Sequence, residues 1–294
     1  MSKEQRQLVQ RVMRKIDKTI AAQLFIDQWI ILTGPRVPYE ALRWEAMQPL
    51  MPPKDRYWGD PFVMQRGDRY YVFIEEKLYA TGVGRIACLI LDAQGKLLSQ
   101  QTALERPYHL SYPFVFEKGG EVYMVPESAS NRTVELYRCT HFPERWELVK
   151  NLLSDVYAVD TTLLEHEGKQ WLFTNIKAAG GSSLDSLHLY YASDLFADEW
   201  KAHPRNPIVQ DIRSARPGGR IFEKEGKLIR PSQDSGRRYG YALKFNRIAT
   251  LNEREYGETG EAAFTPAGSP YLATHTFNQA GELTVIDAVL RRRK

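Results

Sequence analysis

The side chains best suited to chemistry in this sequence lie at the ends of short apolar segments. Five polar residues open such segments: Asp60, Tyr112, Asp160, Arg216 and His275. A second set flanks the first or closes the apolar segment that follows: Glu75, Glu76, His109, Glu127, Asn175, Arg230, Gln233, Asp234 and Asn278. A buried charge costs several kcal/mol unless it is paired. Charges that recur at one position of successive segments therefore indicate a shared ligand site, with an internal ion-pair network as the alternative.

The residue types in these two sets suit a carbohydrate ligand. Carboxylates and amides hydrogen-bond vicinal hydroxyl groups, and aromatic rings such as Trp58 and Tyr108 stack on a pyranose face. Two carboxylates across a cavity can supply the acid and the base of glycoside cleavage. The arginines add a bidentate match for phosphate or carboxylate, although each can equally pair with a carboxylate of the protein. We therefore expect a carbohydrate or sugar-phosphate ligand bound by His109, Tyr112, Glu76, Arg216, Arg230, Gln233, Asp234, His275 and Asn278.

Five copies of one pattern place these residues in a common architecture. Each copy has a polar residue, often followed by proline, then an apolar strand, a turn with glycine and a second apolar strand. The turn glycines recur at roughly fifty to sixty residues, near the size of a four-stranded propeller blade. The sequence thus predicts an all-β, five-bladed β-propeller over residues 28–294, whose inner strands carry the polar residues to the axis. The blades are expected near residues 57–105, 108–154, 157–206, 212–255 and 270–290.

The two ends of the chain complete the predicted ring. Too few residues follow Leu290 to complete the sheet of blade five, which would leave one edge of that sheet unpaired. The apolar segment 28–33 is therefore expected to supply the outer strand of this blade. Residues 1–27 are expected to form a short helical extension, because apolar residues from Leu8 to Ile20 follow helical spacing among basic ones. Its role stays open between a cap on the propeller, a homo-oligomer contact and an anionic membrane surface.

Composition and the motifs that do not occur exclude several other classes. The 294 residues carry a formal net charge of +4, which is too mildly basic to indicate nucleic-acid binding. Residues 1–19 are too charged for a secretory signal, and no apolar run has membrane-spanning length. Together with only two cysteines, this favours reduced thiols and a cytoplasmic location. The sequence has no nucleotide-type glycine-rich loop, no Gly-x-Ser-x-Gly elbow and no metal-type histidine spacing, so we expect no cofactor and no metal site.

Several motifs resemble those of a known group of proteins. The Asp-Pro that opens blade one and the Asp of blade three are similar to the five-bladed propeller glycosidases, which include arabinanases, xylosidases and invertases. A closer resemblance is to the propeller domain of glucosamine inositolphosphorylceramide transferases and of some bacterial sugar formyltransferase fusions. It covers roughly residues 55–290. The motifs are Tyr-His-Leu-Ser-Tyr-Pro-Phe-Val-Phe (108–116), Met-Val-Pro-Glu-Ser (124–128), Val-Asp-Thr-Thr (159–162), Ala-Arg-Pro-Gly-Gly (215–219), Arg-Pro-Ser-Gln-Asp (230–234) and His-Thr-Phe-Asn (275–278).

The resemblance implies roles for individual residues. Asp60 occupies the place of the glycosidase general base, and Asp160 that of the carboxylate that tunes the acid's pKa. Arg216 stands where the glycosidases have a Glu as general acid, and an arginine delivers no proton at neutral pH. Glu127 is the candidate replacement acid, because burial would raise its pKa.

Three functions remain open at this point. The first is an enzyme, hydrolase or transferase, that acts on a glycosidic bond with Asp60 as base. The second is a non-catalytic sugar-recognition module that works beside a glycosyl- or formyltransferase in polysaccharide or glycolipid biosynthesis. The third is a protein-interaction scaffold.

Overall fold

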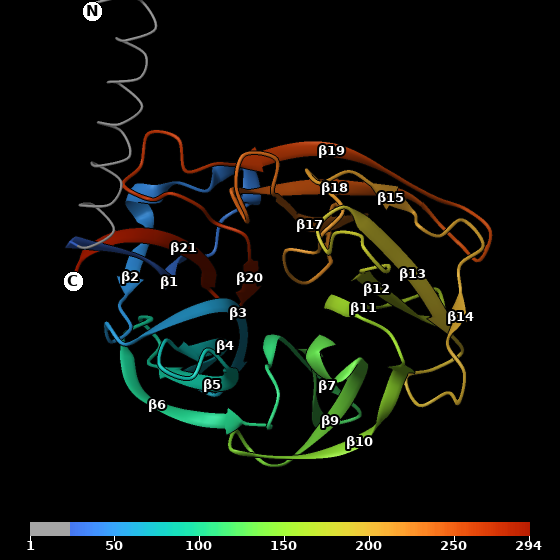
Figure 1. Ribbon diagram of the computed structural model, residues 1–294, viewed down its shortest axis with the longest axis horizontal. Helices are drawn as coiled ribbons and strands as arrows, with labels where there is room; N and C mark the ends of the chain where they lie inside the picture. The colour runs from blue at the N-terminus through green and yellow to red at the C-terminus, as the bar shows by residue number, and fades with distance from the viewer. Residues whose placement is uncertain (1–23) are drawn as a thin grey trace, which may run out of the picture.

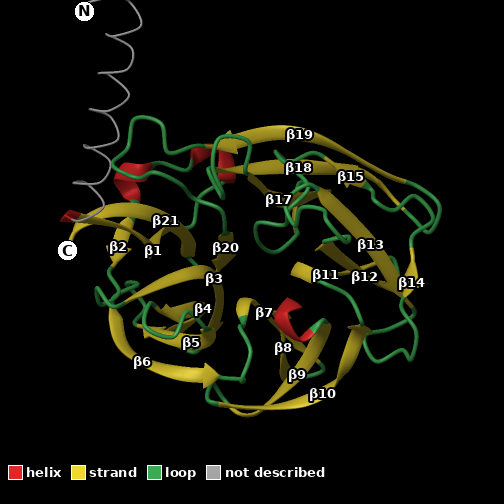
Figure 2. Cartoon of the chain, in the orientation of Figure 1, coloured by secondary structure: helices red, strands yellow, loops and turns green. Residues whose placement is uncertain are grey.

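The computed structural model describes residues 24–294. Within that range, five antiparallel sheets surround a common axis and form a five-bladed β-propeller, which confirms the predicted fold (Figures 1 and 2). The chain runs around the ring blade by blade, and four of the blades step outward from an inner strand in chain order.

The strands divide among the blades as follows. Blade one contains β3 (Arg56–Arg66), β4 (Arg69–Leu78), β5 (Gly84–Leu91) and β6 (Leu97–Leu104). Blade two contains β7 (Ser111–Lys118), β8 (Glu121–Ser128), β9 (Thr133–His141) and β10 (Arg145–Ser154). Blade three contains β11 (Ala158–His166), β12 (Lys169–Ile176), β13 (Ser186–Ala192), β14 (Lys201–Ala202) and β15 (Val209–Gln210). Blade four contains β16 (Phe222–Lys224), β17 (Lys227–Asp234), β18 (Ala242–Leu251) and β19 (Tyr256–Phe264). Blade five contains β20 (Phe277–Ala280), β21 (Leu283–Arg293), β1 (Phe25–Pro35) and β2 (Gln48–Leu50). Short 3-10 helices are η1 (Tyr39–Ala41), η2 (Trp44–Ala46) and η3 (Ala129–Asn131).

Blade five takes its strands from both ends of the described chain. The 11 residues of β1 pair with β21, from Phe25 opposite Arg293 to Pro35 opposite Leu283. The segment 28–33 therefore does close the ring, but it is not the outer strand as expected. The chain turns back through η1 and η2, and β2 then pairs with the outer edge of β1. The predicted N-terminal helix falls on residues 1–23, which lie outside the described residues.

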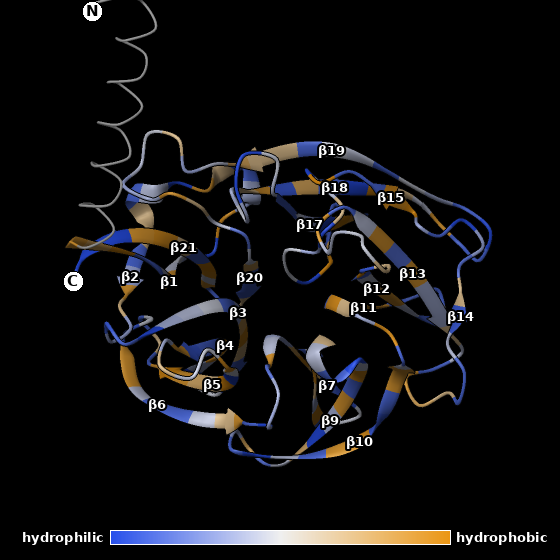
Figure 3. Ribbon diagram, viewed as in Figure 1, coloured by the Kyte–Doolittle hydropathy of each residue, from blue (hydrophilic) through white to orange (hydrophobic). Residues whose placement is uncertain are grey.

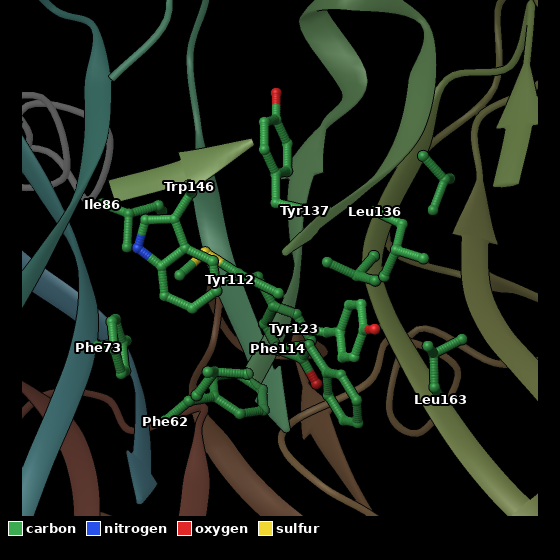
Figure 4. Packing of buried hydrophobic residues seen from close by; sticks show 14 of the residues in the cluster. Phe62, Phe73, Ile86, Tyr112, Phe114, Tyr123, Leu136, Tyr137, Trp146 and Leu163 are labelled. Carbon is green, nitrogen blue, oxygen red and sulfur yellow. The ribbon is translucent and has the colours of Figure 1, made fainter. Parts of the chain in front are cut away.

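Large apolar side chains pack in the seams between blades. Between blades one and two, Phe62 and Phe73 approach Phe114 and Trp146 in one buried cluster (Figure 4). The ring centroids of Phe62 and Phe114 lie 5.6 Å apart. Full burial of a side chain of this size contributes roughly 1.5–3 kcal/mol, so contacts between blades stabilise the ring. Figure 3 shows the sequence pattern behind this packing, with apolar and polar residues interspersed along the strands.

Three inner strands share one irregularity near their first residues. The pairing register shifts at a bulge in β3, β7 and β11. In each bulge one residue has a positive φ, which is 51° at Asp60, 40° at Tyr112 and 52° at Asp160. Such a conformation costs a non-glycine residue about 1–3 kcal/mol, and bulges re-aim the side chains they carry. The strain thus recurs at three of the positions where the sequence predicts site residues.

Blade four has a glycine-rich segment in place of this bulge. Gly219 has a φ of 135°, and a Cβ atom there would lie 2.0 Å from the carbonyl oxygen of Phe277 in blade five. The backbone nitrogen of Phe277 donates to the carbonyl of Gly218 at 2.9 Å. The segment therefore joins blades four and five through a backbone approach that only glycine permits.

Two smaller expectations concern thiols and membrane spans. Cys88 and Cys139 are both free thiols, the first buried and the second half-buried. Within residues 24–294, no helix combines the length and the apolar character needed to cross a bilayer.

The substitution Gly219→Ala is expected to destabilise the protein strongly. A left-handed φ alone costs an L-residue about 1–2 kcal/mol, and the clash with Phe277 is relieved only by separating blades four and five. Urea denaturation should show a loss of about 3 kcal/mol or more in the free energy of unfolding. Gly226→Ala is the matched control, because Gly226 has a φ of 72° but no atom within 4 Å of its Cβ position. Equal losses in the two variants would contradict the argument.

Candidate functional site

Side chains from all five blades meet at one end of the axis in a group called here the axial cluster. Its members are Asp60, Glu127, Asp160, Arg216, Gln233, His275 and Asp287. The register explains part of the convergence, because Glu75, Glu127 and Asn175 occupy equivalent positions opposite the residue that precedes each bulge. Except for Glu127, whose side chain is 11% exposed, every member of the cluster is buried.

Asp160 is held by two side chains of blade four. Arg216 donates to its two oxygens from Nε at 2.5 Å and Nη2 at 3.2 Å. Gln233 Nε2 donates to Oδ2 at 2.6 Å and also to the carbonyl of Pro217 at 2.8 Å. The Oε1 atom of Gln233 is buried and has no hydrogen-bond partner among the described residues. Asp160 is therefore a fixed anion, while Gln233 keeps one acceptor for a ligand or water.

Glu127 lies beside this ion pair. Its Oε2 accepts a hydrogen bond from the backbone nitrogen of Asp160 at 3.3 Å and lies 3.8 Å from Arg216 Nη2. Burial raises the pKa of Glu127 well above its usual range, and the charge of Asp160 raises it further against the opposing effect of Arg216. Burial and the charge of Asp160 thus favour the protonated form of this carboxyl.

Asp60 is held by neighbours from two other blades. Its oxygens accept hydrogen bonds from the backbone nitrogen of Tyr112 at 3.2 Å and the hydroxyl of Thr276 at 3.1 Å. Burial raises the pKa of Asp60 to about 7, with the His275 cation acting in the opposite direction and the charge of Asp160 adding to the rise. This carboxyl therefore changes its ionisation near neutral pH.

His275 and Asp287 form a second buried ion pair. Nδ1 of His275 lies 2.6 Å from Asp287, and its Nε2 lies 3.8 Å from Asp60. Asp287 also accepts hydrogen bonds from the backbone nitrogens of Asp60, His275 and Thr276 at 3.1, 2.8 and 3.1 Å. Burial alone would lower the pKa of His275, but the Asp287 carboxylate raises it to about 9. The pair is thus a cation and an anion that orient Asp60.

Aromatic side chains surround the cluster on its outer side. Trp29 stacks on His275 with a centroid distance of 4.1 Å and an angle of 16°. Tyr239 meets the edge of His275 at 5.5 Å, and the guanidinium of Arg216 lies 5.2 Å from its ring centroid. Tyr57 donates to Glu75 at 2.8 Å. Tyr239 is exposed, whereas the other two are half-buried, and these three rings are called here the rim of the cluster.

Tyr112 lies deeper along the axis than the sequence suggests. Its hydroxyl lies 2.8 Å from the Thr162 hydroxyl and accepts a hydrogen bond from the backbone nitrogen of Gly219 at 2.8 Å. The side chain is fully buried. Tyr112 therefore links blades two, three and four through its hydroxyl group.

Two predicted ligand-binding residues belong to structural ion pairs elsewhere. Arg230 donates to both oxygens of Glu258 at 2.7 and 2.6 Å and to the carbonyl of Ser214 at 2.7 Å. Glu76 is fully buried and accepts two hydrogen bonds from Arg85, at 3.0 and 2.8 Å, and one from Trp58 at 3.1 Å. These partners occupy the charged groups of both residues. Arg230 and Glu76 thus fit the alternative interpretation of the sequence, in which recurring charges form ion pairs inside the protein.

Three further predicted residues also lie outside the cluster. Asp234 caps a turn by accepting from the backbone nitrogen of Gly236 at 2.9 Å. Asn278 donates to the carbonyl of Pro61 at 2.8 Å and accepts from the backbone nitrogen of Arg220 at 3.0 Å. His109 lies at the rim, with Nε2 3.2 Å from Glu75. Asp234 and Asn278 thus have local partners outside the cluster, whereas His109 contacts the same Glu75 oxygen as Tyr57 of the rim.

The sequence interpretation missed Asp287, Trp29, Tyr57 and Tyr239. Asp287 carried a usable signal, because it is the one charged residue within the apolar run Val285–Val289 and is fully buried. Trp58 and Tyr108, the aromatic residues that were expected to stack on a sugar, are bonded to Glu76 and Glu135 instead.

The same region contains the one group of residues within 24–294 that has the geometry of a metal site. Ligand atoms of Asp60, His275 and Asp287 lie within 4.8 Å of one another, and all three residues are buried. Nδ1 of His275 is already paired with Asp287 at 2.6 Å, which leaves Nε2 of His275 and the Asp60 carboxylate as the other possible ligand atoms.

One cavity lies away from the axis. A cavity of about 640 Å³ occupies the seam between blades five and one, lined by Gly34, Leu50, Tyr70, Leu97 and Leu283 among others. Its mainly apolar lining lacks the converging charges of the axial cluster. The axial cluster is thus the better site for chemistry, and the seam cavity is the better site for an apolar group.

The fold is shared with solved sugar-processing enzymes of low sequence identity. A family 117 glycoside hydrolase produced by the marine bacterium Zobellia galactanivorans has a TM-score of 0.57 and 10% identity over 90% of each chain. The GH43_1 enzyme from Xanthomonas citri, solved with xylose, has a TM-score of 0.57 and 9% identity over 81% of this chain and 87% of its own. At this identity, the likeness establishes the propeller fold.

Sequence relatives are considerably nearer. Glucosamine inositolphosphorylceramide transferase 1 from Arabidopsis thaliana is 38% identical over 206 residues, which are 69% of this chain and 27% of the relative. The protein of that name from Oryza sativa subsp. japonica is 37% identical over 204 residues, 68% of this chain and 27% of its own. The chain thus spans about a quarter of the length of these relatives. The family profile described as glucosamine inositolphosphorylceramide transferase 1, N-terminal, matches residues 51–268, and the chain belongs to this family.

Proposed function

We propose that this chain binds a glycoside that carries an anionic group and acts on its glycosidic bond at the axial cluster. The relatives' name refers to glucosamine and to inositolphosphorylceramide, so an amino sugar or a phosphate-bearing glycolipid headgroup is the ligand class that we expect. The observation that carries the proposal is the convergence of Asp60, Glu127 and Asp160 beneath an aromatic rim. Carboxyl groups on the floor and rings at the edge are the groups that bind sugar hydroxyls and pyranose faces.

We infer different roles for Asp60 and Glu127, which each lie 3.8 Å from a cationic side chain, His275 and Arg216. The raised pKa of Glu127 keeps a proton available for a leaving oxygen. Asp60, with a pKa of about 7, is ionised in a large fraction of molecules at neutral pH and can accept a proton from a hydroxyl or a water. A pair of titratable groups with different protonation states is the usual basis of acid and base roles. We therefore assign Asp60 as general base and Glu127 as general acid.

Sugar recognition without chemistry is the second candidate. Arg216 occupies the blade-four position and is engaged by Asp160 through two hydrogen bonds. That ion pair fixes the cluster in one arrangement, which suits binding as well as catalysis. In this candidate function the chain presents a glycoside to a partner transferase.

The substitution Asp60→Asn separates the two candidates. With Asp60 as base, turnover of glycosides and sugar phosphates should fall by about 10²–10⁴-fold, while calorimetry shows ligand affinity changed by less than about tenfold. Asn retains an acceptor oxygen for the Thr276 hydroxyl, so the local fold should survive. Asp234→Asn serves as the control, since Asp234 only caps a turn. Wild-type turnover in the Asp60 variant would remove Asp60 from the mechanism, and ligand binding by the wild-type protein without any turnover would establish the recognition function.

The His275–Asp287 pair should make stability depend on pH in the alkaline range. The pKa of His275 is raised in the folded state to about 9 from 6.5, so the stabilisation is complete below pH 6.5 and disappears as the pH rises through 9. The loss should be about 3 kcal/mol at most. His275→Gln should abolish this dependence in denaturation curves, whereas His141→Gln, at an exposed histidine, should leave it intact. A wild-type stability that stays constant from pH 6 to pH 10 would contradict the ion pair.

A further inference from the structure

The loops on the axial-cluster side of blades four, five and one form a surface with an unusual composition. This surface, called here the docking face, consists of residues 51–55, 79–83, 211–214, 235–241 and 291–293. Its position follows from the strands, because β3 begins at Arg56, four residues before Asp60, and β17 ends at Asp234, next to Gln233. The loops therefore emerge on the side from which the cluster is reached.

Contacts between these loops make the docking face continuous. The backbone nitrogen of Tyr79 donates to the carbonyl of Asp55 at 2.9 Å, and Arg292 donates to the carbonyl of Pro52 at 3.0 Å. The rings of Trp29 and Tyr239 lie 6.4 Å apart, which joins blade five to the 235–241 loop. The backbone nitrogen of Ser235 donates to the carbonyl of Ile212 at 3.0 Å, so the face extends across blade four.

Apolar side chains project from four of these loops. Met51, Tyr79, Val83, Ile212 and Tyr239 are each between 38% and 44% exposed. They come one or two to a loop and do not form a single patch. Isolated apolar side chains at neighbouring loop tips can enter the boundary between lipid headgroups and acyl chains without exposing any backbone.

Cations lie between these apolar side chains. Lys54, Arg213, Arg237, Arg238, Arg291 and Arg293 are all exposed on the docking face. The nearby acids are partly neutralised: Asp27 pairs with Arg291 at 2.7 Å and lies 3.8 Å from Arg238, and Asp55 pairs with Arg56 at 2.9 Å. The face is therefore positively charged on balance.

We propose that the docking face binds the surface of a bilayer that contains anionic lipids. Basic residues near such a surface are attracted by its negative potential, and apolar loop tips add insertion. A soluble polyanion would use the cations but leave the apolar side chains in water, which favours the bilayer. Tyr239 belongs to both the face and the rim of the axial cluster, so a docked bilayer would hold lipid headgroups beside the cluster. This last consequence rests on the proposed function, whereas docking itself does not.

Vesicle sedimentation with the full chain tests the proposal. The probes are vesicles of phosphatidylcholine alone and of phosphatidylcholine mixed with phosphatidylserine. The protein should bind the mixed vesicles more tightly and should be released by high salt, because screening shortens the range of surface charges from about 10 Å at 0.1 M to about 3 Å at 1 M. Each basic residue near the surface contributes about fivefold in partitioning. The double variant Lys54→Glu/Arg237→Glu should therefore bind at least about 25-fold more weakly.

A second pair of variants tests the apolar contribution and supplies the controls. Met51→Ser/Val83→Ser should weaken binding to the mixed vesicles by about fivefold or more. Matched controls are Leu98→Ser/Leu148→Ser on outer strands and Lys201→Glu/Lys227→Glu away from the face, all at exposed positions. The proposal is overturned by absent or equal binding to the two vesicle types, which would leave the face to a protein partner. It is equally overturned if the docking-face variants bind the mixed vesicles as tightly as wild type. The same holds if the control variants lose as much vesicle binding as the docking-face variants. Retained vesicle binding in Asp60→Asn separates docking from the proposed chemistry.

Discussion

The structure depends on compensating charge at the propeller axis. Asp160 and Asp287 are almost completely buried, and a buried carboxylate without a partner would cost several kcal/mol. Each finds its cation in a segment that precedes an inner strand: Arg216 before β16 for Asp160, and His275 before β20 for Asp287. The Asp160–Arg216 pair joins blades three and four. One ion pair therefore stabilises both the buried carboxylate and the contact between two blades of the ring.

The backbone provides the geometry that these charges need. Positive φ values at Asp60 and Asp160 occur in bulges with the same register in blades one and three. Blade five stabilises the first of them, because the Asp287 carboxylate accepts the backbone hydrogen of Asp60. Strain at one strand is thus offset by a hydrogen bond from another. Arg216 belongs to the same arrangement, since its guanidinium holds Asp160 and lies 3.8 Å from Glu127.

The sequence predicted the ring and the convergence of several carboxyl groups because both follow from a repeat. Asp60 and Asp160 occupy matched positions of blades one and three, and Glu127 matches Glu75 and Asn175, so these residues converge in a propeller. The residues that lie outside the axial cluster reflect alternation along a strand and distant partners. Glu75 and Glu76 point to opposite faces, and the sequence alone does not show which of the two faces the axis. The ion pair of Arg230 was not predicted because its partner, Glu258, is 28 residues away on β19.

The rim was missed for a different reason. Trp29 reaches His275 from β1, the third strand of blade five, and Tyr239 comes from the loop between β17 and β18. The prediction of the site used the first two strands of each blade, so it did not include these positions. The same applies to β2, whose pairing outside β1 depends on a turn through η1 and η2 that has no equivalent elsewhere in the ring.

A crystal structure with a glycoside bound tests the central claim most directly. The account predicts that the sugar lies over the axial cluster, within hydrogen-bonding distance of Asp60 and Glu127, with Trp29, Tyr57 or Tyr239 against a pyranose face. A sugar bound instead in the 640 Å³ cavity between blades five and one, with the axial carboxyl groups unchanged, would contradict it.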